Sequence, residues 1–373
     1  MKLTPTFISI IISTTLASNI VYASDYEGSF PVTQKSRVPQ ILSTLVEADR
    51  SAYPHALAFN PDATIIAVHS TYQNIDIWDW KHEHKIASLA LPDTANDLQT
   101  VRPLQFSPDG SLFVVCHGAT DKGEVVTIWE TASWTIKERI VDVGHGSGST
   151  ACAFTPDGKY FVRALTRLQI QAGDTLIVYD TKRWQAIIGK RTNPFWVRAL
   201  SISPNGQYLA MLGSNVSTSA DEAGINDPDF RNLGPLNSSH LLVISLATLG
   251  VKHNYPIATR PNIFSNLEWS DDDTVIFSIG QEAAGINIDN GKEVFHVASK
   301  LAGSRSSLGV ADKGIKLLIA HDGPEAAIEV WDKNHSALGS RIPVDNGGVA
   351  AISKDGKYIA AAIKGAVRVW QAK

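Results

Sequence analysis

Short segments that alternate apolar and polar residues follow one another along the chain, with tight-turn signals between them. In residues 103–141 the segments PLQF, LFVVC, VVTIWE and TIKERIV have the β-branched and aromatic content of strands, and the turn SPDG joins the first two. Gly at the end of such a turn tolerates the positive φ that the turn requires. Alternation places Leu104 and Phe106 on one face of the first strand. The pattern predicts a sheet of four antiparallel strands, named a, b, c and d in chain order.

The same unit recurs seven times. A turn motif and a c-strand motif alternate strictly, and no segment of 10–12 residues keeps a helical period. One four-stranded sheet cannot bury both of its faces, so the units must stack, and a radial stack is a β-propeller. We therefore predict an all-β fold, a seven-bladed β-propeller of four-stranded antiparallel blades. The turns are FNPDA (59–63), FSPDG (106–110), FTPDG (154–158), ISPNG (202–206), WSDDD (269–273), VADKG (310–314) and ISKDG (352–356).

The seventh unit, residues 352–373, contains only three of the four strands. The segment PQILSTLVEAD (39–49) precedes the first turn without a partner, and it has an Ile-x-Ser start similar to that of KIASLAL (85–91), strand d of the first unit. We predict that Ile41–Val46 is strand d of blade seven and pairs with Val367–Trp370. This pairing would close the ring through main-chain hydrogen bonds.

Several c strands end on an aromatic residue followed by an acid. Trp78-Asp79 and Trp331-Asp332 are joined by the variants Trp129-Glu130 and Tyr179-Asp180, and Gly144-His145 lies nine residues before Phe154. With these motifs, residues 40–373 resemble the WD-repeat (Trp-Asp repeat) β-propeller family. One blade alone has the Gly-His pair and blades four and five lack the terminal Trp, so the chain resembles a diverged, exported member of bacterial type. The resemblance implies the fold but no particular function, because related propellers include scaffolds, lactonases and subunits of redox enzymes.

The N-terminal 23 residues have the pattern of a signal peptide. Lys2 precedes an apolar run from Phe7 to Ala17, and Val21-Tyr22-Ala23 supplies a cleavage site. An uncleaved anchor is the alternative, although the run is shorter than the ~20 residues of a membrane span. We expect a signal peptide (1–23), a linker (24–39) and a propeller (40–373) without a membrane span. The mature protein is then exported, either periplasmic or secreted.

Charge and cysteine content narrow the functional classes. The formal net charge is −4 and charged residues are 19% of the 373, which argues against a nucleic-acid or polybasic membrane binder.

The two cysteines, Cys116 and Cys152, fall in neighbouring units. Stacked sheets lie ~10 Å apart, whereas a disulfide needs Cα atoms within ~6.8 Å. We therefore predict two free, buried thiols.

The loops between strands b and c and between units lie on one face of a propeller, which we call the loop face. The longest of them, residues 213–239 of blade four, is predicted to bind a partner, because long loops on a rigid scaffold often carry function; a solvated loop is the alternative. Its oxygen ligands would suit Ca²⁺, but their spacing matches no known calcium loop. The candidate residues of this partner-binding loop are Asp221, Glu222, Asn226, Asp227, Asp229, Phe230 and Arg231.

Polar residues at the starts of the a strands form a second candidate site, at the mouth of the central channel. Arginine side chains there could hold a carboxylate or phosphate by bidentate hydrogen bonds. The alternative is that these residues only fill a hydrated channel. The candidate ligand-binding residues are His55, Arg102 and Arg198, with Arg260 and Arg305 in adjoining loops.

Four histidines are expected on the loop face: His69, His117, His145 and His321. Imidazoles converging there could bind a transition metal or act as general bases. They belong to different blades, and the resemblance implies that His145 hydrogen-bonds within its own blade. A structural role is therefore the alternative for this set.

No sequence motif indicates a reaction. The chain has no Gly-rich phosphate loop, no Gly-x-Ser-x-Gly and no Cys-x-x-Cys, so neither a catalytic residue nor a cofactor is predicted, apart from a possible metal. We expect a monomeric binding scaffold that engages a protein or peptide through its loop face. The alternatives are a lactonase-like enzyme in which Arg102, Arg198 and His55 orient an anionic substrate, an accessory subunit of a redox complex, and a sensor of a small anion or metal.

Overall fold

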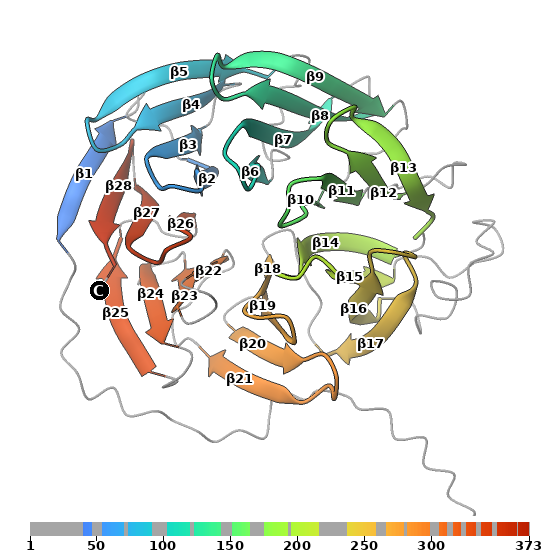
Figure 1. Ribbon diagram of the computed structural model, residues 1–373. Helices are drawn as coiled ribbons and strands as arrows, with labels where there is room; N and C mark the ends of the chain where they lie inside the picture. The colour runs from blue at the N-terminus through green and yellow to red at the C-terminus, as the bar shows by residue number, and fades with distance from the viewer. Residues whose placement is uncertain are drawn as a thin grey trace, which may run out of the picture.

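The computed structural model describes residues 40–46, 54–70, 74–91, 103–119, 123–142, 151–164, 175–192, 195–215, 237–258, 266–279, 282–298, 306–311, 316–321, 326–332, 337–344, 349–363 and 365–372. They form seven separate four-stranded antiparallel sheets. Figure 1 shows these sheets arranged radially as the blades of a ring, with strand a of each blade innermost. The protein is a seven-bladed β-propeller, as the repeat predicted.

The strands of each blade follow in chain order from the inside of the ring to the outside. The first three blades are β2 (Ala56–Phe59), β3 (Ile65–His69), β4 (Asn74–Asp79) and β5 (His84–Ala90); β6 (Leu104–Phe106), β7 (Leu112–Ala119), β8 (Gly123–Glu130) and β9 (Thr135–Asp142); and β10 (Ala151–Phe154), β11 (Tyr160–Ala164), β12 (Leu176–Asp180) and β13 (Gln185–Lys190). Blades four and five are β14 (Phe195–Ile202), β15 (Tyr208–Asn215), β16 (Ser239–Ser245) and β17 (Val251–Ile257), and β18 (Asn266–Trp269), β19 (Thr274–Ile279), β20 (Glu282–Asn287) and β21 (Glu293–Ala298). Blade six is β22 (Ser306–Ala311), β23 (Lys316–His321), β24 (Ala327–Asp332) and β25 (Ala337–Pro343), and blade seven contains β26 (Ala350–Ile352), β27 (Tyr358–Ile363), β28 (Ala366–Gln371) and β1 (Ile41–Val46).

The hydrophobic core lies between neighbouring blades. The cluster between blades one and two contains Ile75, Ile77, Leu104, Phe113 and Trp129, all buried. Because alternate residues of a strand point to opposite faces, each middle strand contributes to the core on both of its sides. This explains why b and c strands such as β15 and β16 are almost entirely buried.

The turn between strands a and b is held by one hydroxyl group. In blade two, Ser107 Oγ donates a hydrogen bond to Asp109 Oδ1 (2.6 Å) and accepts one from the backbone N–H of Leu112 (2.9 Å). Gly110 then adopts a φ of 73°. The same three-residue pattern recurs as Thr155–Asp157–Tyr160, Ser203–Asn205–Tyr208 and Ser353–Asp355–Tyr358.

Strand β1 closes the ring in the predicted way. It pairs antiparallel with β28, with Leu45 opposite Val367 and Val46 opposite Ala366. Leu45 is 1% exposed and packs in a cluster with Trp78, Trp80 and Val367, which joins blade seven to blade one. The backbone N–H of Thr44 also donates to Glu83 Oε1 of blade one (3.1 Å). The prediction that Ile41–Val46 supplies the missing strand is confirmed.

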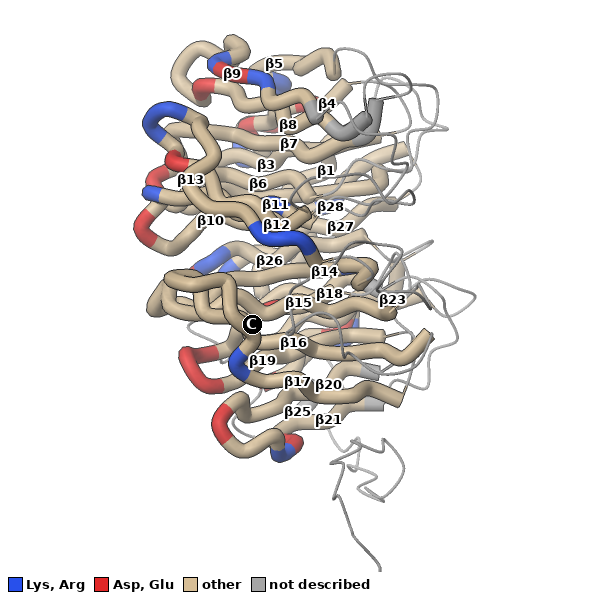
Figure 2. Tube along the Cα trace, turned by 90° about the vertical axis from the view of Figure 1, so that its right-hand side faces the viewer, with Lys and Arg blue, Asp and Glu red and all other residues tan. Residues whose placement is uncertain are grey.

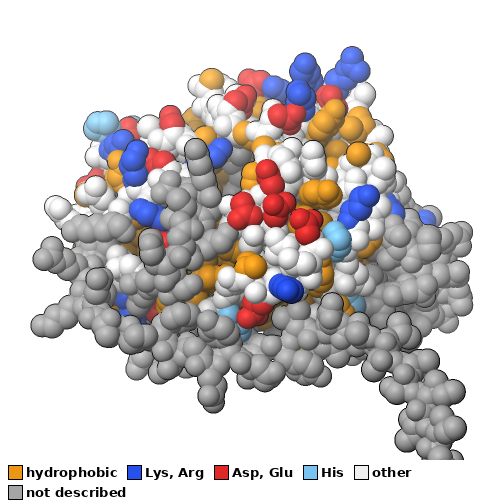
Figure 3. Space-filling view, turned by 60° about the horizontal axis from the view of Figure 1, so that its bottom comes forward, with side chains coloured by type: hydrophobic (Ala, Val, Ile, Leu, Met, Phe, Trp, Pro, Cys, Tyr) orange, Lys and Arg blue, Asp and Glu red, His pale blue; other side chains and the backbone are white. Residues whose placement is uncertain are grey.

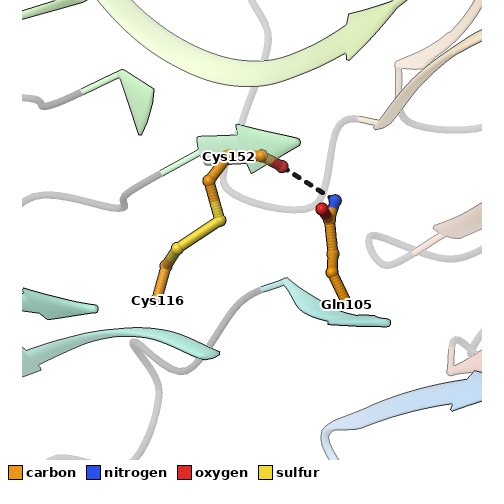
Figure 4. The surroundings of a disulfide bond; sticks show 3 residues. All are labelled: Gln105, Cys116 and Cys152. Atoms are coloured by element: carbon orange, nitrogen blue, oxygen red, sulfur yellow. Dashed lines mark hydrogen bonds between the residues drawn. A yellow bond between two sulfur atoms is a disulfide. The ribbon is translucent and has the colours of Figure 1, made fainter. Parts of the chain in front are cut away.

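The prediction of two free thiols is wrong, because Cys116 and Cys152 form a disulfide between blades two and three. Figure 4 shows the bond and the nearby Gln105, whose Nε2 donates a hydrogen bond to the carbonyl of Cys152 (2.8 Å). The ~10 Å spacing assumed for stacked sheets is a mean. Blades of a ring converge toward its axis, and here the two Cα atoms lie 7.0 Å apart, slightly beyond the usual ~6.8 Å but still at the limit that a disulfide can span.

The predicted signal peptide (1–23) and linker (24–39) lie outside the described residues. Among the residues that the structure describes, no helix has the length and apolarity needed to cross a membrane.

Candidate functional site

The two faces of the ring differ in their described residues. Figure 2 shows charged residues of the short a–b and c–d turns gathered along one side of the molecule. The inner strands begin at the opposite side, the loop face. Blade four differs most from the repeat there, since β14 has eight residues and the other inner strands have three to six.

The additional length of β14 places Phe195, Trp196 and Arg198 at the loop face. The predicted insertion is also shorter than its sequence boundaries of 213–239, because Gly213, Ser214 and Asn215 belong to β15 and Ser239 to β16. Small and polar residues in this segment look like a loop in the sequence, but they continue the ladder that pairs β15 with β14 and β16.

Arg198 lies at a β-bulge. Val197 pairs with Gly213 and Ala199 with Leu212, so Arg198 is the extra residue of the bulged strand. Bulges redirect side chains and are frequent beside functional sites. The Arg198 guanidinium carbon lies 3.8 Å from the centroid of the Trp196 ring, the geometry of a cation–π stack. We call these two side chains the Trp196–Arg198 platform.

A tightly packed base supports the platform. A Cβ atom on Gly213 would lie 2.3 Å from the carbonyl oxygen of Trp196 and 2.8 Å from the ring of Phe195. Only glycine allows this close approach, which leaves Phe195 1% exposed. The ring of Phe195 contacts His240 edge-on, with centroids 6.4 Å apart.

His240 belongs to the base and is held by two hydrogen bonds. Its Nδ1 lies 2.7 Å from Asn254 Oδ1 and its Nε2 lies 2.9 Å from Ser238 Oγ. Burial lowers the pKa of the imidazole, and the hydrogen bond to Asn254 opposes that shift. These bonds use both ring nitrogens, so His240 is suited to positioning its neighbours.

The structure describes two of the five predicted channel-mouth residues. His55 precedes β2 of blade one, where its backbone N–H donates to the carbonyl of His69 (2.7 Å). Arg198 belongs to blade four, which is not a neighbour of blade one in the ring. Arg102, Arg260 and Arg305 lie outside the described residues, as do all candidates of the partner-binding loop: Asp221, Glu222, Asn226, Asp227, Asp229, Phe230 and Arg231.

Two of the predicted histidines are buried. His69 and His117 have no exposed surface, and His117 Nε2 lies 3.0 Å from Thr127 Oγ1. Their burial favours a structural role. His145 and the side chain of His321 lie outside the described residues. Within the described part of the chain, no group of three or more His, Cys, Asp or Glu side chains is arranged to hold a metal ion.

Sequence reasoning missed two residues. Trp196 was signalled only by the aromatic pair Phe195-Trp196 before Arg198. Glu268 lies in the inner strand β18, where its Oε2 accepts a hydrogen bond from Ser201 Oγ of blade four (3.2 Å). Burial raises the pKa of the Glu268 carboxyl to about 7, against the opposing effect of Ser201. An acid among apolar strand residues is the one sequence signal that marks it.

Comparison with known proteins finds distant similarity to proteins of the WD-repeat type. No family model matches the chain. It is 22% identical over 276 residues to the GATOR2 complex protein Mio of Drosophila melanogaster, covering 72% of this chain and 28% of that protein. It is 27% identical over 164 residues to Apoptotic protease-activating factor 1 of Danio rerio, covering 42% of this chain and 11% of that protein. The chain thus spans under a third of either relative. These similarities agree with a propeller fold that commonly serves as a protein-interaction scaffold.

Proposed function

We propose that this protein is an exported scaffold that binds an acidic segment of a protein or peptide partner at the loop face of blade four. The observation that carries the proposal is the Trp196–Arg198 platform, a guanidinium stacked on an indole ring at a bulge of the longest inner strand. Trp and Arg, together with Tyr, are enriched among the residues that contribute most of the binding energy of a protein interface.

The chemistry of the platform favours a carboxylate. A guanidinium has five N–H donors in its plane, and stacking on the face of an aromatic ring uses none of them. A carboxylate can accept two of these hydrogen bonds in parallel, which gives both affinity and orientation. The packed base of Phe195, Gly213 and His240 holds the strand, so little side-chain freedom is lost on binding.

Two further observations support this class of function. The relative from Drosophila is named as a protein of the GATOR2 complex, and a propeller component of a complex acts by contacting partners. The Cys116–Cys152 disulfide supports export, because such bonds persist mainly in oxidising compartments. The signal-peptide pattern of residues 1–23 is consistent with the same route.

Fluorescence anisotropy with a labelled hexaglutamate peptide tests the proposal. We expect Arg198→Ala to weaken binding by roughly tenfold or more, as removal of an interface hot spot does, and added salt to weaken it further. Arg183→Ala is the matched control, because Arg183 is an exposed arginine in the c–d turn of blade three on the opposite face. Equal loss in both variants, or binding of hexalysine as tight as that of hexaglutamate, would contradict the proposal.

The lactonase-like, redox-subunit and sensor alternatives remain sequence predictions. The described residues show no arrangement that favours one of them over partner binding.

A further inference from the structure

The outermost strand of each blade has one edge without a strand neighbour among the described residues. Such an edge can pair with another chain, and folded proteins usually prevent this with charged side chains or proline. Six of the seven outer strands contain a charged residue, and two of them, β17 and β25, also contain proline. Strand β1, with the sequence ILSTLV, contains neither. Its outer edge is therefore the least protected of the seven.

Strand β1 also exposes apolar side chains beside this edge. Ile41, Leu42 and Val46 are 47%, 40% and 48% exposed. Strand β9 has two exposed apolar side chains, but three charged residues lie between them. Leu42 lies at a bulge in the pairing with β28, and a bulge recurs between the two outermost strands of every blade, so it does not protect β1 in particular. An uncharged strand with exposed apolar side chains is suited to pairing with another apolar strand.

One backbone group of the outer edge already has an acceptor. Successive residues of an antiparallel strand direct their N–H and C=O groups to alternate edges. Thr44 donates its N–H to Glu83 Oε1 of blade one (3.1 Å), which places this N–H at the outer edge. The exposed carboxylate of Glu83 thus occupies the position that a carbonyl of an incoming strand would take. Because this hydrogen bond is exposed to water, its net contribution is small and a strand can displace it.

Charge determines which surfaces can meet their own copy. Figure 3, which brings the lower side of Figure 1 forward, shows acidic side chains gathered there; exposed acids in the turns of blade five are Asp271, Asp272, Asp273 and Asp289. Two copies that met through this surface would bring like charges together, which opposes association. Strand β1 brings no charge of its own to such a contact.

We propose that the outer edge of β1 is a pairing surface for a second copy of this chain. The two β1 strands add to one another antiparallel and join two propellers edge to edge. This surface lies on the outer rim of blade seven, and blade four, which carries the platform, is not its neighbour in the ring. The association is therefore independent of partner binding at the platform.

A two-fold axis at Thr44 gives this pairing its register. The N–H and C=O groups of Thr44 then bond to those of Thr44 of the second copy, and Leu42 lies opposite Val46 of the second copy on each side of the axis. No charge of one β1 lies opposite a like charge of the other. Both outer edges are used, so assembly stops at two copies.

The pairing is weak, because two strands of six residues make a small interface. The monomer expected from the sequence is then the state at low concentration. The dimer forms as the concentration rises.

Sedimentation velocity at protein concentrations from about 5 to 500 µM tests the association. We expect the average mass to rise toward that of a dimer, without larger species. Leu42→Lys and Val46→Lys should each weaken the association by roughly tenfold or more, because a lysine on an edge strand opposes pairing. Ile187→Lys is the matched control, since Ile187 is 55% exposed on the outer strand β13. Thermal unfolding shows that each variant is folded.

Cysteine cross-linking tests the register. Thr44→Cys should form a disulfide between two copies under mild oxidation, because Cα atoms of a hydrogen-bonded antiparallel pair lie ~5.5 Å apart, within the range that a disulfide spans. Ile187→Cys should not. Glu83→Ala should strengthen the association by about threefold, the effect of one weak hydrogen bond, since the carboxylate no longer competes for the Thr44 N–H.

Three results would overturn the second copy as the occupant of this edge. The first is a protein that stays monomeric at every concentration; uptake of a labelled peptide of alternating threonine and valine, abolished by Val46→Lys, would then assign the edge to a foreign strand. The second is association that persists in Val46→Lys without a cross-link through Thr44→Cys. The third is association that appears only after deletion of residues 24–39, which would assign the edge to the N-terminal segment of the same chain.

Discussion

A single hydroxyl-bearing residue organises each regular a–b turn of the ring. Thr155 Oγ1 donates to Asp157 Oδ1 (2.7 Å) and accepts from the backbone N–H of Tyr160 (3.0 Å), and three other blades repeat the arrangement with serine. The hydrogen bond from Thr155 is the main reason that the pKa of Asp157 falls from 3.8 to about 2. Turn chemistry thus fixes where strand b begins in every such blade.

Replacing Asp157 by asparagine isolates the charge of this turn, since Asn205 occupies the same position in blade four. We expect Asp157→Asn to lower the free energy of unfolding at pH 7 by less than ~1 kcal/mol, because the carboxylate is exposed. The lowered pKa means that the contribution is present above pH 3.8 and is lost as the pH falls toward 2. Urea denaturation at pH 7 and at pH 2.5 measures the difference. A loss that stays the same at both pH values would contradict this account.

Gly213 is the residue on which the base of the platform depends. We expect Gly213→Ala to destabilise the protein by about 1–3 kcal/mol, because the added Cβ meets the backbone oxygen of Trp196. It should also weaken hexaglutamate binding. Gly339→Ala is the control, since its Cβ would lie 3.4 Å from the nearest atom. Chemical denaturation and anisotropy measure the two effects, and equal stability of both variants would show that blade four relaxes around the methyl group.

Strands β7 and β10 are linked across a blade boundary by the Cys116–Cys152 disulfide. The cysteines are 36 residues apart in sequence. By loop-closure entropy, a bond across such a loop stabilises the folded state by about 3–4 kcal/mol. The covalent bond therefore supports a seam in which a proline and a glycine, Pro108 and Gly158, are also in contact.

Thiol labelling in denaturant checks the bond directly. We expect no free thiol before reduction and two after it. We expect the double variant Cys116→Ala/Cys152→Ala to have a free energy of unfolding lower by about 3–4 kcal/mol, measured by chemical denaturation. Two thiols labelled without reduction would contradict the disulfide and support the prediction of free thiols.

The entire ring depends on the contact of β1 with β28. Leu45 is 1% exposed, and Leu-to-Ala changes in a core cost about 2–5 kcal/mol. We expect Leu45→Ala to lower the free energy of unfolding by an amount in this range. Val46→Ala, at a residue 48% exposed on the same strand, should change the free energy of unfolding by no more than ~0.5 kcal/mol. Thermal unfolding measures both.

Deletion of residues 24–47 should destabilise the protein as much as deletion of 366–373, and a truncated protein that melts like the wild type would contradict closure by β1.

The sequence predicts features that repeat and misses those that depend on one position. Seven recurring turn motifs specify seven blades, and the incomplete last unit specifies β1, because both follow from the repeat of strands and turns. The bulge at Arg198 is a one-residue shift of register that leaves no periodic signal. The Cys116–Cys152 contact depends on how far two blades converge, and the hydrogen bond of Glu268 to Ser201 depends on a neighbour in another blade. The repeated turns predict none of these three features.

Pairing of β1 with β28 also determines when the protein can finish folding during its synthesis. About 320 residues separate Val46 from its partner Ala366. At ribosomal rates of roughly 10 residues per second, β1 waits for its partner for about half a minute. Throughout that time Leu45, which is buried in the finished ring, lacks the contacts that Val367 and Val369 of blade seven supply. A nascent chain of this protein therefore offers its first strand to chaperones, or to other nascent chains, until its last strand has been made.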